Sequence, residues 1–244
     1  MTEQNNSTVI RPKSSIAIPV AIVIAGGLMA AAIFFGLQGS SSLAPFTAKV
    51  PTPTATAPSI NIADVKTENN PFIGSPDAPV VIAEWADYQC PFCKRFDEDA
   101  IKQLKREYID TGKVKLVIKD FAFLGSDSQE AALIARAVWE IDPDKFELWH
   151  SAMYGKQDAE NSGWGNKVDI LTLTKSLGID SVKVAQLVTS KGVEYQKLID
   201  ADKTEAGTLG INGTPGTIIG TDLLSGAVSY ANVKQLIEKA LQNK

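Results

Sequence analysis

Residues 80–93 read VVIAEWADYQCPFC, an apolar run that ends in the motif Cys90-Pro91-Phe92-Cys93. The run starts with β-branched residues and is typical of a buried strand. The residues after Cys90 have the pattern of a helix with a proline in its first turn. A Cys-x-x-Cys pair at the junction of a strand and a helix indicates a thiol–disulfide redox site. Unpaired N–H groups and the dipole at the helix start favour the thiolate of Cys90.

These two cysteines are the only ones in the 244-residue chain. A structural disulfide is one alternative, but cysteines separated by two residues close a very small loop, which restricts the unfolded chain little. A zinc site is another. Zinc usually takes four ligands, and the chain has two cysteines and a single histidine, so subunits would have to share the metal. Redox chemistry explains the pair better than either alternative.

The pattern on both sides of this stretch predicts an α/β fold with one mixed sheet. A strand, a crossover helix and a parallel second strand come first, followed by a helical insertion at about 128–209 and then a hairpin and a final helix. We expect strands at 79–86, 114–118, 217–220 and within 224–228, and flanking helices at 91–109 and 233–241. Inside the insertion we expect helices at 129–141, 144–154, 168–177, 182–190 and 193–206.

The N-terminal part of the chain predicts one transmembrane helix before this domain. Residues 16–37 carry no charge and are long enough to span a bilayer. Arg11 and Lys13 precede them, so the positive-inside rule places residues 1–15 in the cytoplasm and the rest of the chain outside. A cleaved signal peptide is the alternative, with Ser42-Leu43-Ala44 as its cleavage site, but its apolar region would span only about 7–15 residues.

A tether is expected to join this anchor to the globular domain. Residues 38–70 are rich in Ser, Thr, Ala and Pro, a composition that builds no core, and the domain is expected at 71–244. The net charge of −4, without any basic block, argues against nucleic acid as a partner.

Two motifs far apart in the chain closely resemble those of DsbA-like thiol–disulfide oxidoreductases, which belong to the thioredoxin superfamily. They are AEWADYQCPFC at 83–93 and GINGTPGT at 210–217. The resemblance covers about 71–244, and that family carries a helical insertion in the same place. It implies a thioredoxin-like fold, unfolded or partly folded exported proteins as substrates, and a membrane quinone-linked partner that reoxidises the cysteines. No organic cofactor or metal is implied, and a monomer is expected.

The resemblance assigns roles to the first motif. Cys90 would be the exposed nucleophile that forms the mixed disulfide with substrate, and Cys93 the more buried resolving thiol. Pro91 and Phe92 occupy the positions where the family tunes its redox potential. The strongest oxidants of the family carry histidine in place of Phe92, and phenylalanine neither donates a hydrogen bond nor carries charge. This departure argues against a strongly oxidising potential.

Three further residues gain expected roles. Pro215 resembles the family's cis-proline, which turns the backbone of Thr214 toward a substrate that pairs with it as an added strand. An ordinary trans-proline in a glycine-rich turn is the alternative. Glu84 lies six residues before Cys90 in an apolar strand. Burial would raise its pKa, and acids at this spacing in the superfamily are thought to relay protons to the second cysteine. A solvated Glu84 is the alternative.

We therefore interpret the chain as a membrane-tethered, extracytoplasmic thiol–disulfide oxidoreductase that introduces disulfides into exported proteins. A reductase or isomerase of the same fold is the first alternative. Isomerases of the superfamily usually carry a separate dimerisation domain, and a low-complexity tether stands in its place here. A tethered binding module without catalytic activity is the alternative from another class.

Overall fold

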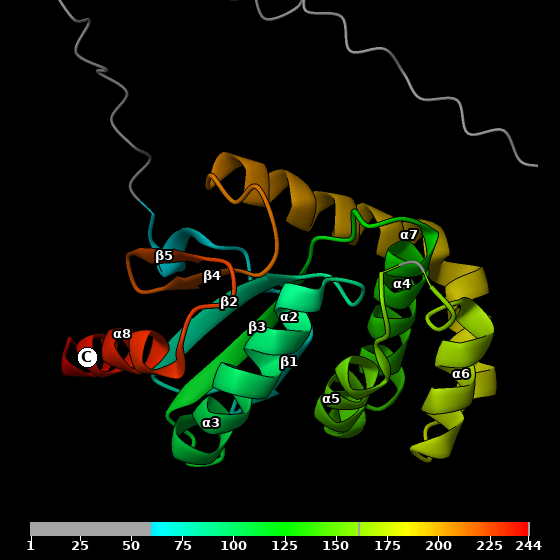
Figure 1. The fold of residues 1–244 in the computed structure, drawn as a ribbon, viewed down its shortest axis with the longest axis horizontal. Helices are drawn as coiled ribbons and strands as arrows, with labels where there is room; N and C mark the ends of the chain where they lie inside the picture. The colour runs from blue at the N-terminus through cyan, green and yellow to red at the C-terminus, as the bar shows by residue number, and fades with distance from the viewer. Residues whose placement is uncertain (1–59, 161, 244) are drawn as a thin grey trace, which may run out of the picture. The chain divides into compact units, whose positions relative to one another are not determined.

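The structure is a computed structural model that describes residues 60–160 and 162–243 (Figure 1). The expected membrane span at 16–37 and most of the expected tether lie outside the described residues. Among the residues that are described, no helix has both the length and the apolar character needed to cross a membrane.

A five-stranded mixed sheet lies at the centre of the domain, with the strand order β1-β3-β2-β4-β5. The two central strands, β2 and β3, run parallel, and the other neighbours pair antiparallel, which confirms the predicted mixed sheet. The sequence pattern did not indicate β1, because a strand of three residues is too short to show a period. The strands are β1 (Phe72–Gly74), β2 (Val80–Ala86), β3 (Val114–Asp120), β4 (Gly216–Ile219) and β5 (Asp222–Ser225).

The alternation of side chains along β2 decides which of them face the cysteines. Ile82 and Ala86 belong to the apolar core that also contains Cys93, whereas Ala83 and Trp85 belong to a second cluster on the other face of the sheet. Because successive strand residues point to opposite faces, Glu84 faces the same side as Ile82 and Ala86.

The helical segment after Cys90 is less regular than predicted. α2 (Pro91–Phe96) and α3 (Lys102–Leu104) are separated by one π-helical turn, η2 (Asp97–Ile101), and followed by another, η3 (Lys105–Ile109). Such widened turns occur inside helices without a clear sequence signal, so the pattern predicted one plain helix. Apolar side chains of this segment and of α8 (Tyr230–Gln242) fill the core on the Glu84 face of the sheet.

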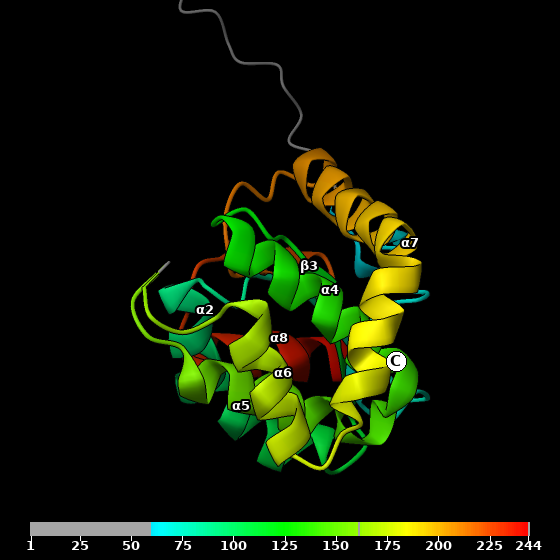
Figure 2. The same cartoon turned by 90° about the vertical axis from the view of Figure 1, so that its right-hand side faces the viewer.

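The helical insertion lies between β3 and β4, as predicted, and Figure 2 shows its four main helices side by side. They are α4 (Ser126–Ile141), α5 (Phe146–Lys156), α6 (Lys167–Ser176) and α7 (Ser181–Thr208), with a short turn η4 (Pro143–Lys145) before α5. The prediction of separate helices at 182–190 and 193–206 is wrong, because α7 continues through Gly192. A glycine inside a helix costs only about 1 kcal/mol relative to alanine, and packing of α7 on α4 outweighs that cost.

Buried ion pairs join α7 to the sheet on the Trp85 face. Asp202 of α7 lies 2.5 Å from Lys119 Nζ and 2.6 Å from Arg136 Nη2, and the same Arg136 nitrogen lies 2.6 Å from Asp120. None of the four side chains is more than 8% exposed. We call these four residues the Asp202 cluster. Each charge in it faces an opposite charge, as buried ions require.

Residues before Pro71 also pack on the domain. The N–H of Ile62, at the start of η1 (Ile62–Asp64), donates to Gly220 O at 2.7 Å. Val65 is buried in the apolar cluster on the Trp85 face. The described contacts of the domain therefore include the last residues of the segment expected to be a tether.

Candidate active site

Cys90 and Cys93 lie at the first turn of α2, after the short loop that follows β2. Cys90 is the N-cap, with an extended backbone (φ −77°, ψ 118°), and its carbonyl accepts the N–H of Cys93 at 3.1 Å. Both are free thiols, 4% and 0% exposed respectively. Pro91 and Phe92 are exposed, and Phe92, at 52%, lies against the Arg95 guanidinium, 5.0 Å from the ring centre. Cys93 is thus fully buried, as expected, and Cys90 is less exposed than expected.

The second motif, GINGTPGT at 210–217, contacts Cys90. The Thr214–Pro215 peptide bond is cis, as predicted, so the trans alternative is wrong. Cys90 Sγ donates to the carbonyl oxygen of Thr214 at 3.4 Å, across 124 positions of sequence. The pairing of β4 with β2 carries this loop to the cysteines. Gly216 is needed at the start of β4, because a Cβ there would lie 2.5 Å from Ile211 Cγ2.

The surroundings of the two thiols shift their pKa values in opposite directions. A hydrogen bond from the Cys93 side chain lowers the pKa of Cys90 to about 6, helped by backbone N–H groups at the helix start and opposed by burial. Burial raises the pKa of Cys93 well above its ordinary value, and its interactions with Cys90 and Glu84 add to the effect. Near neutral pH, therefore, Cys90 is a thiolate and Cys93 a thiol.

Glu84 lies in the core beneath the cysteines. It is only 2% exposed, so the alternative of a solvated side chain is wrong. Its Oε2 atom is buried and has no hydrogen-bond partner among the described residues. Burial raises the pKa of Glu84 to about 8, and negative charge on Asp97 and Cys90 contributes in the same direction. Glu84 therefore holds a proton near neutral pH close to the pair of sulfurs.

Comparison with known proteins agrees with this geometry. The family model described as thioredoxin matches residues 66–239. The chain belongs to the thioredoxin family. It is 30% identical over 178 residues to disulfide bond formation protein D of Bacillus subtilis, covering 72% of this chain and 79% of that protein. Such relatives make it a DsbA-like thiol–disulfide oxidoreductase and argue against a binding module without catalytic activity.

Solved structures lead to the same conclusion. Oxidised BdbD from Bacillus subtilis superposes with a TM-score of 0.68 at 28% identity, over 75% of this chain and 97% of that one. The thiol–disulfide exchange protein α-DsbA2 from Wolbachia pipientis has a TM-score of 0.63 at 28% identity, over 70% of this chain and 87% of that one.

The side chain of Asp87 holds the N-terminal end of the loop between β2 and Cys90, which we call the active-site loop of this oxidoreductase. Asp87 follows β2 and is 1% exposed. Its Oδ1 accepts the N–H of Gln89 at 2.8 Å and the hydroxyl of Ser128 at 2.6 Å, while its Oδ2 accepts the N–H groups of Phe123 at 3.0 Å and Leu124 at 3.2 Å. One side chain thus ties the cysteine loop to the loop that enters the insertion. Sequence analysis missed it, although an aspartate just after a strand is a common organiser of turns.

A second side chain of the oxidoreductase holds the same loop from the insertion. Gln157, at the end of α5, donates from Nε2 to the carbonyls of Tyr88 at 2.7 Å and Cys90 at 3.1 Å. Lys94 of α2 donates back to the carbonyl of Gln157 at 2.8 Å. This contact joins segments more than sixty positions apart, and no local sequence signal marks it.

Aromatic residues of the insertion pack beneath this loop. Tyr88 Oη and His150 Nδ1 are 2.8 Å apart, and burial lowers the pKa of His150 to about 4, so the ring is neutral. Trp149 is fully buried against Tyr88, with ring centres 5.3 Å apart. Trp139 and Trp164 are partly buried against the same core. These residues pack the core that supports the active-site loop.

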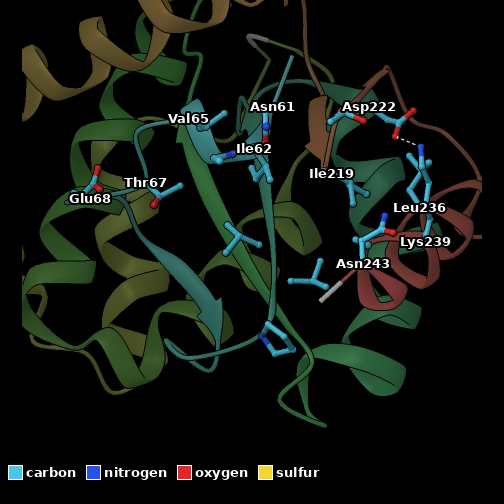
Figure 3. A pocket seen from close by; sticks show the side chains of 17 residues that line it. Asn61, Ile62, Val65, Thr67, Glu68, Ile219, Asp222, Leu236, Lys239 and Asn243 are labelled. Carbon is cyan, nitrogen blue, oxygen red and sulfur yellow. Dashed lines mark hydrogen bonds and ion pairs between the residues drawn. The ribbon is translucent and has the colours of Figure 1, made fainter. Parts of the chain in front are cut away.

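A pocket of about 600 Å³ lies away from the cysteines, between the start of β2 and the end of β4 (Figure 3). Ile62 of η1 lines one side and Leu236 of α8 another, and an ion pair of 2.9 Å between Asp222 and Lys239 lies at its edge. None of the residues with expected catalytic roles lines this pocket.

Proposed function

We propose that this oxidoreductase is tethered to a membrane and introduces disulfides into unfolded or partly folded proteins outside the cytoplasm, with Cys90 as nucleophile and Cys93 as resolving thiol. The contrast between the two thiols carries the proposal. Cys90 has a pKa of about 6 and borders the Thr214 carbonyl, whereas Cys93 is fully buried and protonated. This is the asymmetry that disulfide exchange needs.

The reaction would follow from that asymmetry. A substrate thiolate attacks Cys90 Sγ of the oxidised pair, the Cys90–Cys93 bond breaks, and Cys93 leaves with the electron pair and takes up a proton. A second substrate thiolate then attacks the substrate sulfur of the mixed disulfide, and Cys90 leaves as a thiolate. The substrate loses two electrons and gains a disulfide, and the cysteine pair is left reduced.

Glu84 would exchange the proton with Cys93. The support is its position in the core beneath the sulfurs and a pKa of about 8, which lets it give and take a proton near neutral pH. Replacing Glu84 by glutamine should slow exchange with a peptide dithiol, whereas Glu98→Gln, at an exposed position of η2, should not. Unchanged rates in the Glu84 variant would rule out the relay.

Thr214 and Pro215 would bind substrate. An extended substrate strand can pair with the Thr214 backbone, whose carbonyl already lies 3.4 Å from Cys90 Sγ. Pro91 and Phe92 would set the reduction potential. A histidine in place of Phe92 can donate a hydrogen bond to the Cys90 thiolate, so Phe92→His should raise the potential.

The uncharged segment at 16–37 would anchor the chain, with residues 1–15 in the cytoplasm and the catalytic domain outside. A membrane quinone-linked protein would reoxidise the cysteines. Protease treatment of intact cells tests the orientation, because the catalytic domain should be digested while an N-terminal epitope stays protected. Protection of the domain would refute it.

The direction of electron flow is tested by equilibrating the protein with glutathione. A potential near about −120 mV would make it a donor of disulfides, whereas one near about −270 mV would make it a reductase. The phenylalanine at position 92, where the strongest oxidants carry histidine, favours the reductase alternative. Cys90→Ser should abolish exchange in either direction.

A further inference from the structure

The core beneath Cys93 contains four buried oxygen atoms that have no hydrogen-bond partner among the described residues. They belong to two carboxyl groups and two hydroxyl groups: Glu84 Oε2, Asp97 Oδ2, Tyr154 Oη and Thr217 Oγ1. Buried polar groups are nearly always paired, so four such atoms in one region are unusual. None of these residues is more than 4% exposed.

The fold brings these groups to the same side of the sheet. Thr217 of β4 lies directly opposite Glu84 of β2 in the register. Asp97 follows Cys93 by four positions, and its N–H donates to the Cys93 carbonyl, so both side chains lie on the inner face of the helix. Tyr154 reaches the same place from α5. Besides burial, negative charge on Cys93, Glu84 and Asp97 raises the pKa of Tyr154, which reflects how close the groups lie.

Asp97 is the member of this group that borders solvent. Its Oδ2 lies 3.9 Å from Lys102 Nζ, and the Lys102 side chain is 48% exposed whereas that of Asp97 is 6% exposed. Glu84, by contrast, has no charged partner of opposite sign among the residues that the structure describes. Burial raises the pKa of Asp97 to about 6, and Lys102 opposes the rise. Asp97 can therefore hold or release a proton in the pH range where the thiols react.

Other charged groups near Asp97 are few or already paired. Glu98 on its own turn and Glu147 of α5 add negative charge. The α8 helix also packs on this turn, and its three charged residues bind elsewhere: Lys234 to Glu107, Glu238 to the Tyr108 hydroxyl, and Lys239 to Asp222.

We propose that Asp97 is the outer carrier of a proton path that runs from Cys93 through Glu84 to Asp97 and then to solvent beside Lys102. The hydroxyl groups of Tyr154 and Thr217 line the path. Asp97 acts on the reaction only through Glu84 and touches no reacting sulfur. The inference rests on the proposed function, because it concerns the proton that Cys93 gains or loses.

Oxidation of the reduced protein by glutathione disulfide isolates the step. The Cys90 thiolate attacks the disulfide and releases one glutathione thiolate. Cys93 then loses its proton and attacks Cys90 Sγ of the mixed disulfide, which forms the Cys90–Cys93 bond and releases the second glutathione thiolate. Glu84 first releases its own proton to Asp97, from which it leaves to solvent, and the Glu84 carboxylate so formed takes the Cys93 proton.

The test compares Asp97→Asn with Asp99→Asn, which makes the same chemical change at an exposed position two residues away. Resolution of the glutathione mixed disulfide is timed in the whole chain from pH 5 to pH 9. Asp97→Asn should slow resolution about tenfold at pH 7, less than the roughly 100-fold that loss of a direct proton donor costs. Asp97→Glu should restore most of the rate, and Asp99→Asn should match the unmodified chain.

Infrared spectroscopy supplies a readout that a merely structural role would not move. The carbonyl band of protonated Glu84, identified by its loss in Glu84→Gln, should disappear at lower pH in Asp97→Asn, because the neighbouring negative charge is gone. In Lys102→Gln the corresponding Asp97 band should persist to higher pH. This second variant leaves the buried groups unchanged and serves if Asp97→Asn does not fold.

Equal rates in Asp97→Asn and Asp99→Asn would overturn the path. A uniform slowing at every pH, with the Glu84 band titrating as in the unmodified chain, would also overturn it and show a structural role. An unmodified chain without exchange activity would refute the proposed function itself.

Discussion

Replacing Glu84 by glutamine should stabilise the folded protein at pH 7 while leaving its stability at pH 4.5 almost unchanged relative to that of the unmodified chain. Glu84 is fully enclosed in the core, and its pKa is raised from an ordinary 4.5 to about 8. A group with a raised pKa contributes its full stability below the unfolded pKa and loses it as the pH rises toward the folded pKa. The unfavourable window for Glu84 is therefore pH 4.5 to 8.

The magnitude follows from that window. Each pH unit between the two pKa values costs about 1.4 kcal/mol, so a carboxyl with a pKa of about 8 when folded loses about 3 kcal/mol between pH 4.5 and pH 7. Glutamine does not titrate and loses nothing over this range. Between pH 4.5 and pH 7, the unfolding free energy of the variant should therefore rise by about 3 kcal/mol relative to that of the unmodified chain.

Urea denaturation at pH 4.5, 6 and 7 measures this difference, with Glu98→Gln as the control because that glutamate is exposed. The control should show no comparable change. A stability difference for Glu84→Gln that is the same at all three pH values would refute the argument, because the carboxyl would then not be held neutral by the fold. A Glu84→Gln variant that is more stable but exchanges disulfides more slowly would show that the carboxyl lowers the stability of the fold while serving the exchange reaction.

Three further predictions concern single side chains. Thiolate absorbance near 240 nm should titrate with a midpoint near pH 6 and vanish in Cys90→Ser; a midpoint near 9 would contradict the assignment. Gln157→Leu leaves the Tyr88 carbonyl without its buried side-chain donor, while the Cys90 carbonyl keeps the N–H groups of Cys93 and Lys94, and should lower urea stability by about 1–3 kcal/mol, with an unchanged midpoint as the contrary result. Arg136→Leu leaves Asp120 and Asp202 buried with too little positive charge and should cost about 3–5 kcal/mol by the same assay, and a neutral effect would show that the pairing contributes nothing.

Local patterns predicted the centre of the fold correctly. The apolar run before Cys90 forms β2, and the cysteine pair lies at the start of α2. The register of β2 and β4 could not be derived from the sequence, but the two resembling motifs were enough to predict that Pro215 meets the cysteines in the cis form. Glu84 was expected in the core because it lies inside an apolar strand, at the spacing from the cysteines where the superfamily has a buried acid.

Long-range contacts were the part that sequence reasoning missed. Gln157 supports the cysteine loop from a polar stretch with no motif, and Asp87 has four partners, three of which lie more than thirty positions away. The π-helical turn that orients Asp97 has no sequence signature. Gly192 suggested a helix break that packing overrides. Each of these depends on residues that are brought together only when the sheet forms.

The Asp202 cluster has a consequence for how this architecture can be dissected or redesigned. Its acid at position 202 comes from the insertion, whereas Lys119 and Asp120 come from the sheet that every thioredoxin-like domain must build. Excising the insertion to obtain a minimal thioredoxin would leave the buried Lys119 ammonium without its two counter-ions in α7, Asp202 and Glu205. The inserted helices are therefore not a detachable module in this chain, and a truncated scaffold would first need an apolar residue at position 119.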